Sequence, residues 1–224
     1  MSLENLPRKI NIGCGFDIRA GWLNVDGQAF HKPDMVMDFT DLSELPASHF
    51  DYLLAKDILE HVPRGVQVST LKGWERLMAP GATLHIQVPS LFDLAHNARF
   101  NPEWSTLEAQ HNAIQLLCGT QAYEGDWHFC HYTPATLIDL AKQARLQLTH
   151  CEIRDGWMYA ADFKKEFWPI TNEEFVHQAY FHNLWRPAEE AGLQHHLALL
   201  ESGTPRGVVA DALKKAFNTD QPRS

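Results

Sequence analysis

Apolar runs of strand length dominate the first half of the chain. Five of them stand out, at residues 10–12, 22–25, 35–37, 50–55 and 83–88. Because polar residues rarely interrupt them, they favour strands buried on both faces, as in a parallel sheet. Between the last two runs, apolar residues repeat at helical spacing from Val66 to Met78, and Pro80-Gly81 is placed to end this helix. The pattern predicts a right-handed strand–helix–strand crossover in an open, doubly wound, Rossmann-like α/β sheet.

Residues 91–131 interrupt this pattern. They hold few strand signals, several histidines, and the tryptophans Trp104 and Trp127. An insertion after the fifth strand lies over the carboxyl ends of the strands, where open α/β sheets bind ligands. We therefore expect a helical lid over the substrate, with tryptophans that either stack on sugar faces or pack in the core.

The following segment closes the sheet. Thr133-Pro134 begins a helix that runs to about Arg145, with Thr as the N-cap and Pro at the first helical position. The apolar runs at 146–153 and 157–163 then predict two strands, paired as an antiparallel hairpin at the sheet edge. The sheet would thus have about seven strands, most of them parallel.

The last part of the chain, from about residue 168, has helical periodicity only. Thr171 and Glu174 match a capping box, a second helix covers about 188–200, and Thr204-Pro205 begins a third. We expect an α/β domain at residues 1–165 and a small helical appendage at 166–224.

Charge and composition narrow the function classes. The 224 residues include 19 Lys and Arg against 28 Asp and Glu, a net charge of −9, which disfavours a nucleic-acid binder. The longest apolar stretches are strand-sized, which predicts no transmembrane helix, and residues 1–7 do not resemble a signal peptide. The four cysteines show no paired or metal-type spacing, which favours a reduced, cytoplasmic protein.

The sharpest chemical signal lies at residues 10–15, Ile-Asn-Ile-Gly-Cys-Gly. There a strand runs into Gly13-x-Gly15, and Asp26 ends the next strand. Glycine lets a ligand approach the backbone closely, and an acid at the end of the second strand can accept hydrogen bonds from ribose hydroxyls. This pattern predicts a cofactor that contains a nucleoside.

Two features argue against a dinucleotide cofactor. The third glycine of G-x-G-x-x-G is absent, because Asp17 and Ile18 follow Phe16. The interval from Gly15 to Asp26 is 11 residues, against roughly 20 in the dinucleotide fingerprint. No room is left for the full helix whose N-terminus would hold a pyrophosphate.

At this point the chain resembles a known family. Residues 10–15 are similar to motif I of class I S-adenosylmethionine-dependent methyltransferases. Four further blocks resemble a bacterial subgroup associated with surface glycan synthesis: Gly-Trp-Leu-Asn-Val-Asp at 21–26, residues 50–62 with Leu-Glu-His-Val at their end, residues 77–89 around Pro-Gly, and His-Tyr-Thr-Pro at 131–134. The resemblance covers about residues 8–155.

The resemblance implies cofactor contacts by position. Motif I, with Asn11, Gly13, Cys14 and Gly15, would lie at the methionine part, and Asp26 would hold the ribose. The adenine would meet Asp38 with Phe39 behind it, or else Asp41. The amino acid part or the transferred methyl would lie near Ala55, Lys56 and Asp57. Two departures stand out: Asn11 replaces a common acid, and Asp57 stands where the subgroup often has His.

Three histidines are candidates for a general base, because an imidazole with a pKa of about 6.5 can take a hydroxyl proton at neutral pH. We rank them in the order His131, His128, His61. The alternative for Glu60-His61 is a structural helix-start pair. His128-Phe129-Cys130-His131 lacks the spacing of zinc-binding motifs, so we expect no metal there.

The resemblance implies methyl transfer from S-adenosylmethionine to an oxygen, with a sugar or glycan-linked hydroxyl as acceptor. A small-molecule O or N acceptor is the alternative, and a cofactor-binding module without turnover is the alternative of another class. The C-terminal segment resembles a small helical domain of unknown function that is appended to bacterial surface proteins and glycan enzymes. It is also a candidate for self-association into a homo-oligomer.

Overall fold

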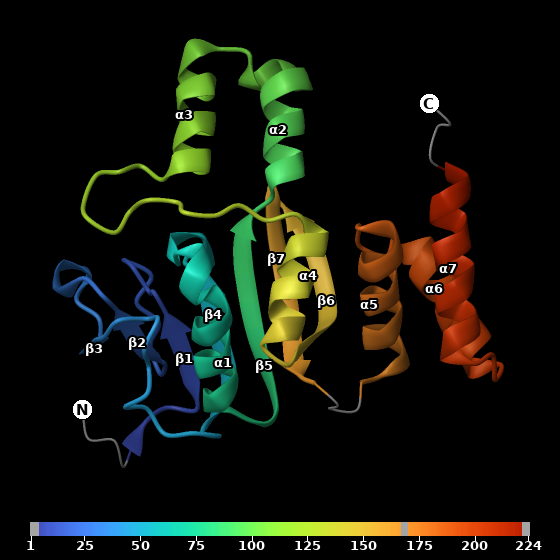
Figure 1. The fold of residues 1–224 in the computed structure, drawn as a ribbon, viewed down its shortest axis with the longest axis horizontal. Helices are drawn as coiled ribbons and strands as arrows, with labels where there is room; N and C mark the ends of the chain where they lie inside the picture. Colours follow the sequence, from blue (N-terminus) through green and yellow to red (C-terminus); the bar gives the residue numbers. More distant parts are fainter. Residues whose placement is uncertain (1–4, 167–169, 221–224) are drawn as a thin grey trace.

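A seven-stranded sheet forms the centre of the computed structural model, which describes residues 5–166 and 170–220, with only the backbone at 217–220. The strand order is β3-β2-β1-β4-β5-β7-β6 (Figure 1). The strands are β1 (Lys9–Ile12), β2 (Leu23–Asp26), β3 (Met35–Val36), β4 (Phe50–Lys56), β5 (Met78–Pro89), β6 (Leu146–Arg154) and β7 (Met158–Lys165). Strands β1 to β5 pair in parallel, and β7 pairs antiparallel with both β5 and β6. The predicted Rossmann-like fold class, including the edge hairpin, is confirmed.

Two predictions touch residues outside this description. The expected absence of a signal peptide concerns residues 1–7, of which 1–4 lie outside the described residues. The predicted start of the helical appendage, at 166–168, falls largely on 167–169, which also lie outside them. None of the helices within the described part of the chain combines the length and apolar character needed to cross a bilayer.

Helices α1 (Gln67–Leu77) and α4 (Pro134–Gln143) cover one face of the sheet (Figure 1). The predicted Thr133 cap of α4 is present, since the Thr133 hydroxyl accepts a hydrogen bond from the Thr136 N–H. The end of α1 differs from the prediction. The helix ends at Leu77, and Pro80-Gly81 lies inside β5, where residues 79–82 bulge out between the pairs Phe50–Met78 and Tyr52–Thr83.

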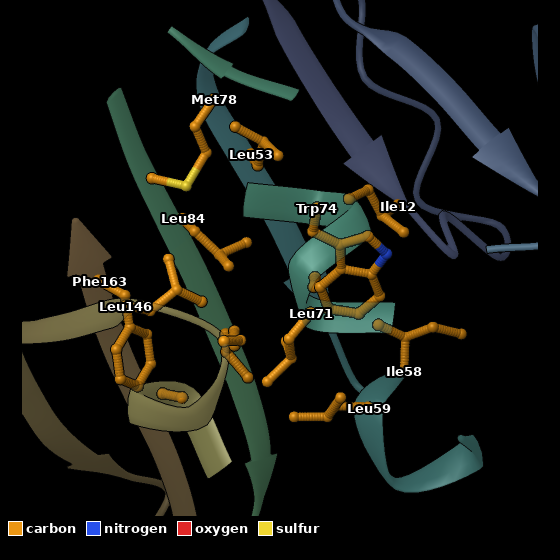
Figure 2. Close-up of a cluster of buried hydrophobic side chains, with 14 of the residues drawn as sticks. Ile12, Leu53, Ile58, Leu59, Leu71, Trp74, Met78, Leu84, Leu146 and Phe163 are labelled. Atoms are coloured by element: carbon orange, nitrogen blue, oxygen red, sulfur yellow. The ribbon is translucent and has the colours of Figure 1, made fainter. Parts of the chain in front are cut away.

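The main core lies between α1, α4 and the covered face of the sheet. Trp74 and Leu71 of α1 pack there with the fully buried side chains Leu53 and Leu84 from β4 and β5 (Figure 2). The indole N–H of Trp74 donates to the Phe39 carbonyl at 2.8 Å, which ties the loop after β3 to the helix. This packing fixes the carboxyl ends of the central strands, where the sequence predicts the ligand site.

The opposite face of the sheet is polar. Tyr52 and Lys56 of β4 and His85 and Gln87 of β5 line a cavity of about 500 Å³ on this face, with Lys56 exposed and His85 and Gln87 buried. The β1–β2 and β2–β3 connections contain no α-helix, only a short 3₁₀ turn at Ala29–His31. The expectation of strands buried on both faces holds for β2 and for residues 84–89 of β5, whereas Lys56 of β4 is exposed.

The C-terminal segment forms α5 (Asn172–Leu184), α6 (Glu190–Glu201) and α7 (Arg206–Asp220). The predicted capping box is present: Thr171 accepts from the Glu174 N–H at 3.1 Å, and Glu174 accepts from the Thr171 N–H at 2.8 Å. Helix α5 contributes Phe181 to the main core and Val176 to a second apolar cluster with α6 and α7. Because α5 belongs to both clusters, it attaches the C-terminal helices to β6.

The contact between α5 and β6 predicts that the stability of the fold depends on pH. The ring of His177 lies 4.6 Å from that of His150, centroid to centroid, and His177 Nδ1 is buried without a hydrogen-bond partner in the described chain. Burial lowers the pKa of His177, the charge of His150 lowers it further, and Glu173 opposes the shift. The unfolded chain takes up its proton first, near pH 6.5, so this contribution is present above that pH and is lost as the pH falls toward the lower folded pKa.

We therefore expect the melting temperature to fall between pH 7.5 and pH 5.5, and to fall less in His177→Gln. The exposed His195 provides the control, because His195→Gln should keep the wild-type pH dependence. Thermal unfolding followed by circular dichroism at both pH values measures the effect. Equal pH dependence in His177→Gln and wild type would contradict the prediction.

Candidate functional site

A cavity of about 570 Å³ opens at the carboxyl ends of β1, β2 and β4. Its sheet side includes Gly13, Gly15, Asp26, Phe39, Asp57, Glu60 and His61. Its other side comes from the insertion: α3 (Leu107–Cys118) and the segment after it contribute Asn112, Gln115, Tyr123, Asp126, His128 and Phe129. Figure 1 shows α2 (Leu91–Phe100), α3 and this segment above the strand ends. The insertion therefore lies where the sequence predicts a lid, and its role as a cover over the substrate stays a prediction.

The turn after β1 is built around the carboxylate of Asp26. Gly13 and Gly15 both have positive φ, at 64° and 50°. The N–H of Gly15 donates to Asp26 Oδ2 at 2.8 Å, and the N–H of Gln28 donates to Oδ1 at 2.8 Å. The imidazole Nδ1 of His31 lies 2.9 Å from the same Oδ1. A carboxylate has about four acceptor sites, so Asp26 still has acceptor capacity for a ligand in the cavity.

His31 is a cavity residue that the sequence reasoning missed. It is only 5% exposed and lies among the rings of Phe16, Phe30 and Tyr123, with centroid distances of 4.6, 4.2 and 5.7 Å. Tyr123 belongs to the insertion, so this aromatic cluster joins the insertion to the turn after β2. The sequence signal that could have identified His31 is its position five residues after Asp26.

Of the remaining predicted cofactor residues, two line the cavity. Phe39 presents an apolar wall, and Asp57 lies at the end of β4 with a strained φ of 54°. Desolvation raises the pKa of Asp57, and the nearby Lys56 ammonium opposes this shift. Lys56 itself is exposed, with its Nζ 4.0 Å from an Asp57 oxygen, and is not among the lining residues.

The others support the site from behind or lie beside it. Asn11 is buried and donates to the Asp17 carbonyl at 2.7 Å, which fixes the turn after β1. Cys14 and Ala55 are also buried, and burial together with Asp26 raises the pKa of Cys14 to about 11. Asp38 and Asp41 accept hydrogen bonds from Thr40 and Ser43 within their own loop. The lining of the cavity includes none of these five residues.

Two of the three predicted base candidates face the cavity. The rings of His61 and His128 lie 4.7 Å apart, centroid to centroid, at an interplanar angle of 86°. Burial and then the charges of His61 and His131 lower the pKa of His128 to about 4, and burial also lowers the pKa of His61. Both imidazoles are therefore neutral at pH 7. His131, ranked first from the sequence, lies 6.1 Å from His128 and is not among the lining residues.

Glu60 lies in the 3₁₀ turn Leu59–His61 after β4 and is fully buried against the cavity. Neither carboxylate oxygen has a hydrogen-bond partner in the described part of the chain. Burial raises the pKa of Glu60 well above its ordinary value, and the charge of Asp57 adds to this. The Glu60 carbonyl accepts the N–H groups of Phe129 and Cys130 at 2.8 and 3.3 Å, so this turn also anchors the insertion.

The two glycines after β1 should differ in their tolerance of alanine. A Cβ on Gly13 would overlap the side chain of Ile58, whereas a Cβ on Gly15 would meet no atom within 4 Å. The free energy of unfolding of Gly15→Ala is expected to fall by about 1–2 kcal/mol, because alanine is strained in this left-handed backbone conformation. Gly13→Ala adds an overpacking cost of about 1–3 kcal/mol. Chemical denaturation of both variants measures the difference, and equal losses would contradict it.

Comparisons with known proteins find similarity to solved structures only. No protein-family model matches the chain, and no curated protein matches it. The structure of PKMT2 from Rickettsia typhi is similar, with a TM-score of 0.50 and 13% identity over 79% of this chain and 52% of that chain. A SAM-dependent methyltransferase from Methanosarcina mazei has a TM-score of 0.48 and 16% identity over 70% of this chain and 92% of that one. Burkholderia thailandensis 1,6-didemethyltoxoflavin-N1-methyltransferase, solved with S-adenosylhomocysteine, has a TM-score of 0.47 and 12% identity over 70% of each chain.

Proposed function

We propose that the protein binds S-adenosylmethionine in the 570 Å³ cavity and transfers its methyl group to an oxygen acceptor. The observation that carries the proposal is the arrangement of Gly13, Gly15 and Asp26. A glycine turn after β1 is held by a nearly buried carboxylate at the end of β2, and both face the same cavity. The resemblance of residues 8–155 to class I methyltransferases supports this assignment.

The residues present fit such a cofactor. The free acceptor capacity of Asp26 suits ribose hydroxyls, and the direction of the missing Gly15 Cβ is open. Phe39 and Ile58 give apolar walls for a purine. Residues 17–60 hold nine acids and three bases, which favours a ligand with an ammonium and a sulfonium cation.

When bound, the cofactor would supply a methyl group on a cationic sulfur that is open to attack by an acceptor oxygen. The chain's own part is alignment and exclusion of water. The insertion covers the strand ends, and its Phe129 and Tyr123 narrow the cavity. The neutral imidazoles of His61 and His128 face the cavity and are the candidate acceptors for the proton of the hydroxyl.

A sugar or glycan-linked hydroxyl is the acceptor that we propose. The cavity offers the side-chain amides of Asn112 and Gln115, which can bind hydroxyls, and the ring of Trp157, which can stack on a sugar face. Trp104 and Trp127, which the sequence suggested for stacking, do not line the cavity. The stacking residue in this proposal is therefore Trp157, which comes from the β6–β7 turn.

The test is calorimetric titration of the protein with S-adenosylmethionine and S-adenosylhomocysteine, followed by a methyl-release assay. The assay panel contains hydroxylated sugars and small molecules with O and N acceptors. Binding and turnover on a sugar would support the proposal. Turnover only on a small O or N acceptor would refute the glycan assignment, binding without turnover on the whole panel would favour a cofactor-binding module, and absence of binding would refute the proposal.

A further inference from the structure

Glu60 and His61, from the sheet side of the cavity, meet His128, which comes from the insertion. Each offers a ligand atom, and these atoms all lie within 4.8 Å of one another. We infer that the three side chains bind a divalent transition-metal ion, with zinc as the reference ion. Its open coordination position would face the cavity.

The Glu60 carboxylate is the first reason. The side chain is fully buried, and neither of its oxygens has a hydrogen-bond partner within the described residues. A buried polar group in this state costs free energy, and a charged one costs more. A cation bound between Glu60 and the two imidazoles would remove this cost directly.

The imidazoles are the second reason. His128 Nδ1 lies 3.0 Å from the Leu116 carbonyl, so Nδ1 must carry the proton and Nε2 presents a lone pair. Metal-bound histidines typically donate their other ring N–H in this way. On His61, Nδ1 is buried and has no hydrogen-bond partner in the described structure. With the rings at 86° and their centroids 4.7 Å apart, both can approach one ion.

The donor set indicates the class of ion. Two imidazoles and one carboxylate suit zinc and neighbouring first-row divalent ions, and a three-residue set leaves a position for water or a hydroxyl. Magnesium and calcium prefer oxygen ligands only. Two further carboxylates, Asp57 and Asp126, line the same cavity and favour a cation there through longer-range attraction.

Binding of an ion excludes a role of the same nitrogens as proton acceptors. The buried carboxylate of Glu60 favours ion binding over base catalysis, because two imidazoles that act as bases need no carboxylate beside them. A bound ion lowers the pKa of an oxygen ligand, so an acceptor hydroxyl on the ion would release its proton to water without a protein base. Use of this effect on the acceptor hydroxyl depends on the proposed function, whereas binding of the ion does not.

The test starts from full-length protein that has been freed of metal with EDTA. Titration with zinc chloride, and metal analysis after gel filtration, should give one ion per chain, and magnesium chloride should give none. Glu60→Gln and His128→Gln should each weaken zinc binding by at least the roughly 10–100-fold that loss of an outer-shell partner costs. His131→Gln is the matched control, because His131 is outside the group, and it should bind zinc as wild type does.

Two outcomes would overturn the inference: no stoichiometric zinc, or zinc binding that persists unchanged in Glu60→Gln and His128→Gln. Circular dichroism of both variants checks that they fold. Titration of the same metal-free protein with S-adenosylhomocysteine separates the two proposals. If S-adenosylhomocysteine binds and zinc does not, only the metal site is overturned. If zinc binds and S-adenosylhomocysteine does not, only the methyl-transfer proposal is overturned.

Discussion

Asp26→Asn should weaken the binding of S-adenosylhomocysteine by roughly 10- to 100-fold. In the proposed function Asp26 binds the ribose, so the substitution would remove the charge from those hydrogen bonds, and a hydrogen bond to a charged group contributes about 1.5–3 kcal/mol. Asp26 is only 6% exposed, so solvent screens these bonds little. Isothermal titration of wild type and variant gives the two dissociation constants.

Two further variants show whether the effect belongs to the ribose. Asp51→Asn removes a carboxylate that pairs with Arg8 on the surface at the start of β4, so it should leave the affinity unchanged. His31→Gln disturbs the turn around Asp26 but keeps the carboxylate, so its loss should be clearly smaller. An unchanged dissociation constant in Asp26→Asn, or an equal loss in His31→Gln, would refute the ribose assignment.

The parts of the fold that the sequence predicts well are those specified locally. Apolar runs identify all seven strands, and the N-terminal signals at Thr133 and Thr171 identify the starts of α4 and α5. The polar side chains on the second face of the sheet were not predicted, because apolar runs do not report which face each polar neighbour occupies. The β1–β2 connection contains no α-helix, as the short interval between Gly15 and Asp26 predicts. A loop residue, Trp22, therefore lies against Tyr52 of β4 on this face.

The residues of the cavity also divide into those that meet through local sequence and those that meet only through the folding of distant segments. Gly13, Gly15 and Asp26 lie close together in sequence at the ends of paired strands, so a short motif indicates that they meet. Glu60 and His128 meet only because the insertion folds back and Phe129 donates to the Glu60 carbonyl. No periodicity or spacing encodes a contact over that separation. The local cluster at 128–131 does not contain His61, whose ring lies 4.7 Å from that of His128 in the structure.

The metal-free protein is expected to become more stable when Glu60 is replaced by Met. The buried carboxylate has no partner among the described residues, and such a group costs about 1–3 kcal/mol or more. For a chain of this length, each kcal/mol gained raises the melting temperature by roughly 2–4 °C. Glu60→Gln keeps the polar volume, so it should gain less. Thermal unfolding in EDTA measures both variants.

Zinc should reverse this order. An ion that binds only the folded state stabilises wild type and leaves Glu60→Met nearly unchanged, because the variant lacks one of the three ligands. A lower melting temperature of Glu60→Met in EDTA would mean that the carboxylate supports the fold through a partner. If Glu60 instead lowers stability without zinc and raises it with zinc, the carboxylate at this position is explained by its binding of the ion. Its effect on the stability of the metal-free fold would not explain it.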